Sequence, residues 1–184
     1  NGEISLSLGL TKHEAFEYQI TSAPAIIGDL VVSGAMVIDS FRPGVPAGVV
    51  RAYHIRSGEF VWGWNPTHPD REQMDEAGTY TPGTTNVWST ISVDAERGLV
   101  IVPTGNSSPD YYGGDREGHL DYYSSSVVAL DAATGEVAWH YQTVHHDIWD
   151  YDVPAQPTFV DLTIDGQERP AVVQVTKMGM TCVL

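Results

Sequence analysis

The chain has 184 residues, of which 24 are acidic and 9 basic, so its formal net charge is −15 at pH 7. A charge of this size repels phosphate backbones and anionic lipid headgroups, and we expect no nucleic-acid partner. The single cysteine, Cys182, excludes an internal disulfide and a cysteine-based metal site.

Short β-branched runs, punctuated by 18 glycines and 11 prolines, predict an all-β protein. No long segment carries apolar residues at the spacing of an amphipathic helix. In chain order, the predicted strands are Ala25–Ile27, Leu30–Ser33, Val49–His54, Phe60–Trp64, Ser89–Val93, Leu99–Thr104, Ser125–Asp131, Val137–Gln142, Thr158–Leu162, Ala171–Thr176 and Met180–Leu184.

Two of the predicted hairpins share one design. Gly58 and Gly135 occupy the turns, Trp62 and Trp139 follow on the last strands, and both pairs are 77 residues apart. The glycine allows the positive φ of a hairpin turn, and the tryptophan is large enough to cover the face between neighbouring sheets. Such a repeat is typical of a β-propeller blade, although two unrelated hairpins in a sandwich would also fit.

We therefore predict a partial β-propeller of roughly two and a half four-stranded blades. The prediction treats residues 1–184 as a single domain, with blade-like repeats at roughly 18–65, 86–142 and 155–184, the last incomplete. The sequence begins at Asn1 and stops inside an apolar run at Leu184, so we expect an internal piece of a longer protein.

Residues 145–152 (HHDIWDYD) combine two imidazoles, three carboxylates and two large aromatic rings. Carboxylates so close repel one another unless a cation, a proton or water separates them, which indicates a metal, a general base or both. The alternative is a polar surface loop. On an extended backbone Asp150 and Asp152 would share a face and could reach one ion.

Three stretches carry a resemblance to a known family. The second hairpin, with Ala129, Asp131, Thr134, Gly135 and Trp139, is similar to the tryptophan-docking motif of the quinoprotein dehydrogenases, although the first hairpin departs from it at His54 and Ser57. Residues 141–157 and 103–116 resemble the membrane-bound glucose and quinate branch of that family. The resemblance runs from about Tyr18 to Leu184 and implies an eight-bladed propeller that binds pyrroloquinoline quinone (PQQ) and a divalent metal.

The resemblance implies a catalytic base and a set of metal ligands. Asp150 matches the catalytic aspartate, and Asp39, Asn106 and Asp150 match oxygen ligands that suit Ca²⁺ or Mg²⁺. Asp152 resembles the extra ligand of lanthanide-using relatives, so a lanthanide is a further possibility. An asparagine after glycine is also a common turn former, so Asn106 has a structural alternative.

Four further residues match positions that contact PQQ in the family. Trp88 would stack on the cofactor ring, Lys177 would face its oxygens, and Thr21 and Ser108 would donate hydrogen bonds to it. The alternatives are a packing tryptophan, a surface lysine, and hydroxyls that satisfy nearby backbone groups.

As a whole, the resemblance implies a PQQ-dependent dehydrogenase that oxidises a sugar or polyol and passes electrons to ubiquinone. It also implies membrane association on the periplasmic side of a bacterial inner membrane. We expect the fragment alone to be inactive and to bind PQQ poorly. The alternative function is a non-catalytic propeller of the same repeat family that serves as an envelope assembly scaffold, which would have no need for Asp150, Trp88 and Lys177 together.

Overall fold

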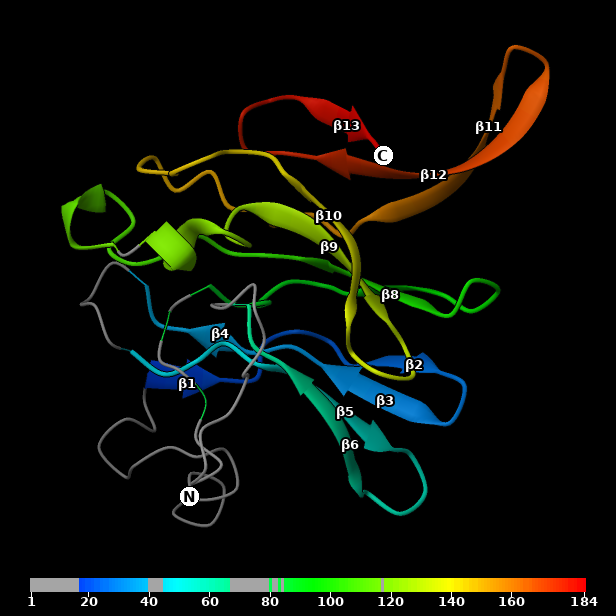
Figure 1. Cartoon of the computed structure of the whole chain (residues 1–184), viewed down its shortest axis with the longest axis horizontal. Coiled ribbons are helices and arrows are strands. Elements are labelled where there is room, and N and C mark those ends of the chain that lie inside the picture. The colour runs from blue at the N-terminus through cyan, green and yellow to red at the C-terminus, as the bar shows by residue number, and fades with distance from the viewer. Residues whose placement is uncertain (1–16, 40–44, 67–79, 81–82, 84, 117) are drawn as a thin grey trace.

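The computed structural model describes residues 17–39, 45–66, 80, 83, 85–116 and 118–184. Nearly all regular structure in these ranges is β-strand, and every pairing is antiparallel. Three larger sheets follow one another along the chain and lie one above another, from the blue β2–β3 hairpin to the red β13 (Figure 1). The chain is therefore an all-β partial propeller, as predicted.

The first sheet has four strands in the order β2-β3-β5-β6. They are β2 (Ala25–Ile27), β3 (Leu30–Ser33), β5 (Val50–His54) and β6 (Phe60–Trp64). The β2–β3 hairpin turns at Gly28, whose φ of +56° is a conformation that glycine adopts without strain.

The second sheet also has four strands, in the order β7-β8-β9-β10. They are β7 (Ser92–Asp94), β8 (Leu99–Pro103), β9 (Ser126–Asp131) and β10 (Val137–Gln142). The two central strands are buried along almost their whole length. Both faces of this sheet are covered, which explains why these strands read as continuous apolar runs rather than alternating ones.

Side chains of the second sheet supply two separate cores by strict alternation. Val100, Val128 and Leu130 join a core that includes Val32 and Val50 of the first sheet. The intervening residues of the same strands face the third sheet, in a core made by Ile101, Val127, Ala129, Val153 and Val172.

The third sheet contains β11 (Thr158–Ile164), β12 (Gln167–Val175) and β13 (Thr181–Val183), in that order. A two-residue turn joins the first two strands, with Asp165 at φ +53° and Gly166 at φ +76°. Aspartate followed by glycine is the pair that this turn prefers, since both residues tolerate positive φ.

Smaller elements complete the described fold. Two short strands, β1 (Tyr18–Gln19) and β4 (Met36–Val37), pair with each other. Two 3₁₀ turns, η2 (Gly113–Asp115) and η3 (Gly118–Asp121), lie between β8 and β9. No helix in the described part of the chain is long and apolar enough to cross a bilayer.

Trp62 joins the first sheet to the second. The ring is 6% exposed, and its Nε1 donates a hydrogen bond of 2.8 Å to the carbonyl oxygen of Ala132. A Cβ added to Gly135 would lie 2.6 Å from the indole ring, so only glycine leaves room for it. The repeated glycine and tryptophan of the two hairpins thus meet across the seam between sheets.

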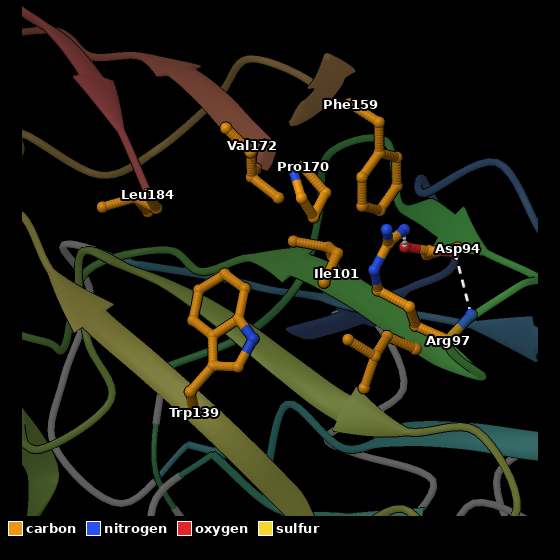
Figure 2. A pocket seen from close by; sticks show the side chains of 10 residues that line it. Asp94, Arg97, Ile101, Trp139, Phe159, Pro170, Val172 and Leu184 are labelled. Atoms are coloured by element: carbon orange, nitrogen blue, oxygen red, sulfur yellow. Dashed lines mark hydrogen bonds and ion pairs between the residues drawn. The ribbon is translucent and has the colours of Figure 1, made fainter. Parts of the chain in front are cut away.

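Trp139 occupies the corresponding place on the second sheet. It lines a cavity of about 210 Å³ between the second and third sheets, together with Ile101, Phe159 and Val172. Figure 2 shows the indole on β10 facing this largely apolar space, with the side chain of Leu184 on the opposite wall.

Most predicted strands match the observed ones to within one or two residues. The strand expected at Ala171–Thr176 begins earlier, at Gln167, and contains Pro170. Proline is tolerated there because β12 pairs only with β11 at that position, so no second neighbour needs its missing N–H. The strand expected at Ser89–Val93 begins at Ser92.

Candidate functional site

The acidic run 145–152 forms the connection between β10 and β11 rather than a strand. His146 and Asp150 both have positive φ, +47° and +58°. The left-handed conformation costs a non-glycine residue about 1 kcal/mol, so the surrounding contacts must hold it. The expectation that Asp150 and Asp152 share one face of an extended segment is therefore wrong.

Asp147 anchors this connection from inside the protein. Its side chain is fully buried and accepts a hydrogen bond of 2.7 Å from the hydroxyl of Ser125 and one of 3.0 Å from the backbone N–H of Trp149. Its carbonyl oxygen accepts a hydrogen bond of 3.1 Å from Nδ2 of Asn106. These bonds tie the acidic connection to Ser125, which directly precedes β9, and to the segment after β8.

Lys177 faces both predicted acidic site residues. Its Nζ lies 3.1 Å from Oδ2 of Asp150 and 3.0 Å from the carbonyl oxygen of the same residue. It also forms an ion pair with Oδ1 of Asp152. Lys177 follows the end of β12. The third sheet therefore places the Lys177 ammonium beside the connection between β10 and β11.

Asp152 and Thr21 both hold Trp88. The indole Nε1 donates a hydrogen bond of 2.8 Å to Oδ2 of Asp152, and the Thr21 hydroxyl donates one of 2.9 Å to the carbonyl oxygen of Trp88. The structure thus links predicted site residues into one chain of polar contacts: Thr21, Trp88, Asp152, Lys177 and Asp150.

Burial and neighbouring charges shift the pKa values of Lys177 and Asp39. Burial opposes the charge on Lys177, but the hydrogen bonds to Asp152 and Asp150 outweigh it and raise the pKa of the ammonium. Loss of hydration and the nearby charge of Asp150 raise the pKa of Asp39. The charges of Asp39, Asp150 and Lys177 therefore act on one another in the same region.

Asn106 is buried in the segment that follows β8. Its Oδ1 accepts a hydrogen bond of 2.7 Å from the backbone N–H of Ser107, while Nδ2 binds Asp147 as described above. An amide oxygen has a second lone pair, so this bond leaves one acceptor position for a cation. Ser108 is buried two residues later, and its contact with a cofactor stays a prediction.

No group of three or more His, Cys, Asp or Glu side chains among the described residues is arranged to hold a metal ion. Asp39 and Asp150 nevertheless repel each other, and a cation between them would relieve that repulsion. Each carboxylate oxygen of Asp152 already has one partner, Trp88 or Lys177, so an ion bound by Asp152 would share that carboxylate with them.

Sequence reasoning missed Arg116, which holds the loop between β8 and β9. Its guanidinium is fully buried and donates hydrogen bonds of 2.7 Å to Pro109 O and 3.1 Å to Asp110 O. It also forms an ion pair of 3.1 Å with Asp121, whose other oxygen lies 2.7 Å from Nδ1 of His146. The available signal was a basic residue at the end of the stretch 103–116, which resembles the family.

Tyr111 is a second residue that the sequence did not single out. Its ring is 66% exposed, and the charge of Asp150, more than any other influence, raises the pKa of its phenol. Because the charges of Asp150 and Lys177 both act on this phenol, Tyr111 lies near the same site. The arrangement therefore offers a carboxylate, a paired ammonium and a half-buried indole, with a phenol close by, which suits a planar anionic ligand and proton transfer.

A family model described as PQQ: Glucose/ethanol/alcohol dehydrogenase, beta-propeller domain, matches residues 1–184. Among curated proteins, the chain is 41% identical over 187 residues to a quinate/shikimate dehydrogenase (quinone) of Acinetobacter baylyi, covering 100% of this chain and 23% of that protein. It is 37% identical over 184 residues to a quinoprotein glucose dehydrogenase of Escherichia coli, again covering 100% of this chain and 23% of the relative.

A solved structure of a europium-containing methanol dehydrogenase is similar to this chain, with a TM-score of 0.75 at 26% sequence identity. The match covers 91% of this chain and 32% of that one. The chain thus spans about a quarter of the length of the curated relatives named above.

Proposed function

Because this chain belongs to the family of PQQ-dependent glucose, ethanol and alcohol dehydrogenase β-propellers, we propose that the complete protein is a quinoprotein dehydrogenase. Its proposed substrate is a sugar or cyclic polyol, as in the glucose and quinate dehydrogenases to which the chain is similar. The observation that carries the proposal is the continuous polar chain from Thr21 through Trp88, Asp152 and Lys177 to Asp150.

The described residues fit PQQ in two respects. Trp88 is half-buried, so part of its ring can contact a planar cofactor. The Lys177 side chain is 34% exposed, and its ammonium can face the cofactor's oxygens. Thr21 and Ser108 are the proposed hydroxyl contacts. When bound, PQQ supplies an electrophilic quinone that accepts a hydride from the alcohol carbon.

The proposed metal ligands are Asp39, Asn106 and Asp150. Carboxylate and amide oxygens are hard ligands, which Ca²⁺ and Mg²⁺ prefer, and the metal would act as a Lewis acid. A lanthanide is a third candidate, since one relative of known structure contains europium. Asp152, if it joined this set, would share its carboxylate between the ion, Trp88 and Lys177.

Asp150 is the proposed general base. Its side chain is 27% exposed, so a substrate hydroxyl can reach the carboxylate. It would accept the hydroxyl proton while the carbon–hydrogen bond breaks, so that the alcohol loses one proton and one hydride and becomes a carbonyl. Lys177, 3.1 Å away, holds the carboxylate in place and stabilises its charge.

We propose ubiquinone as the electron acceptor, since one relative is named as a quinone-dependent dehydrogenase. The proposed location, the periplasmic side of the inner membrane, rests on the family resemblance of the sequence. We also propose that residues 1–184 form one partial domain, with blades at roughly 18–65, 86–142 and 155–184. The alternative is a scaffold propeller. A scaffold has no need to bury Asp152 between an indole and an ammonium.

The decisive experiment uses the complete protein, reconstituted with PQQ and Ca²⁺ and assayed by dye reduction with sugars and polyols. Asp150→Asn should lower turnover by about 10²- to 10⁴-fold and leave PQQ bound, because it removes proton acceptance. Asp161→Asn, an exposed position on β11, is the matched control and should keep full turnover. Turnover that survives Asp150→Asn would refute the base, and a wild-type protein without PQQ absorbance or activity would favour the scaffold.

A further inference from the structure

Asp152 holds two proposed cofactor-binding side chains at once. The residue is 4% exposed, and its two carboxylate oxygens have different partners. Oδ2 accepts the indole N–H of Trp88 at 2.8 Å, while Oδ1 pairs with the ammonium of Lys177. Trp88 precedes the second sheet and Lys177 follows β12 of the third, so Asp152 links groups from two different sheets.

The two contacts restrict the rotation of the Trp88 ring and the movement of the Lys177 ammonium. The indole N–H is a donor in the plane of the ring, so a hydrogen bond to it fixes the ring about its last side-chain torsion. The lysine ammonium sits on a flexible four-carbon stem, and a buried carboxylate confines it to one place.

We propose that Asp152 is a positioning residue, which sets the plane of Trp88 and the location of the Lys177 ammonium for PQQ. This inference rests on the proposed function, because it takes Trp88 and Lys177 as cofactor contacts. It differs from the metal-ligand prediction, which gives Asp152 a direct contact with an ion. Asp152 acts through its two partners, and its effect should vanish when they are removed.

The first test measures PQQ affinity of the complete apoprotein at saturating Ca²⁺, by quenching of protein fluorescence. Asp152→Ala should weaken PQQ binding about 10- to 100-fold, the usual effect of removing a group that orients a ligand-binding side chain. Asp152→Asn keeps an acceptor for the Trp88 N–H but none for the ammonium, and should lose less. Asp161→Asn is the matched control and should bind PQQ as the wild type does.

The second test repeats Asp152→Ala in a protein that already carries Trp88→Phe and Lys177→Met. Asp152 then has neither partner, so the substitution should change PQQ affinity by less than about twofold. An undiminished loss in that background would overturn the proposal. If Asp152→Ala fails to fold, as judged by its thermal unfolding, Asp152→Asn in the same two backgrounds provides the same comparison.

A third measurement separates positioning from metal binding. The dissociation constant for Ca²⁺ alone, without PQQ, should be the same in Asp152→Asn as in the wild type, whereas a weakening of tenfold or more would make Asp152 a metal ligand and overturn the proposal. The proposed function fails in a different way, since the wild-type protein itself would then neither bind PQQ nor oxidise an alcohol.

Discussion

Gly135 shows how a single residue decides whether two sheets can meet. It lies at φ +75°, and its missing Cβ makes room for the Trp62 ring. Gly28 also has a positive φ, +56°, but a Cβ added there would meet nothing within 4 Å. A substitution at Gly28 therefore adds backbone strain alone, whereas one at Gly135 adds strain and a collision with Trp62.

We predict that Gly135→Ala lowers the free energy of unfolding more than Gly28→Ala does. Both variants place alanine in the left-handed region, at about 1 kcal/mol each. Gly135→Ala additionally displaces the indole of Trp62, for a further 1–3 kcal/mol or so. Thermal unfolding midpoints of the two variants check this, and equal midpoints would contradict the packing shown by the structure.

At the scale of elements, the β7–β8 hairpin is stabilised by Asp94. Its Oδ1 accepts the backbone N–H groups of Glu96 and Arg97 at 3.0 Å, and its Oδ2 pairs with the Arg97 guanidinium at 2.7 Å. Burial alone would raise the pKa of Asp94, but the hydrogen bonds from Arg97 and Glu96 outweigh it and lower the pKa.

The lowered pKa predicts a specific dependence of stability on pH. The contribution of Asp94 is complete above the unfolded-state pKa of about 3.9 and is lost as the pH falls through the lower pKa of the folded state. Asp94→Asn, which keeps the Oδ1 acceptor, should be less stable than the wild type at pH 7 by about 1 kcal/mol or less, because Arg97 is half-exposed. The difference should shrink below pH 4; a constant difference between pH 7 and pH 3 would exclude the charge as its cause.

Local patterns predicted most strands because each depends on residues close in sequence: a turn glycine, a β-branched run, a proline. The two-residue strands β1 and β4 were missed because so short a pair carries no periodicity. The candidate site was predictable only through family resemblance. Its decisive contacts join Trp88 to Asp152, 64 positions apart, and Lys177 to Asp150, 27 apart, and no local spacing encodes them.

At the scale of the whole molecule, the sheets are held to one another by side chains rather than by strand pairing. The seam between the first two sheets contains Trp62 and a shared apolar core. The seam between the second and third contains a smaller core and the cavity beside Trp139. The first seam therefore contains the larger of the two cores.

We predict that Trp62→Phe destabilises the protein by about 1–3 kcal/mol, because it leaves the Ala132 carbonyl without the indole N–H and trims a buried ring. Trp149→Phe, at a ring that is 56% exposed, should change stability by less than about 0.5 kcal/mol. Combining Trp62→Phe with Gly135→Ala should cost less than the sum of the single variants, since both alter one contact. Additive losses, measured by the same unfolding midpoints, would show that the two residues act separately.

The polar chain from Thr21 to Asp150 also has a consequence for the order in which the protein matures. Strand ladders join neighbouring segments and close short loops, whereas the links Thr21–Trp88 and Trp88–Asp152 close loops of more than sixty residues. Long loops close at a greater entropic cost, so we expect these links to form after the strand ladders. On the proposed function, PQQ would therefore bind only a chain whose sheets have already assembled.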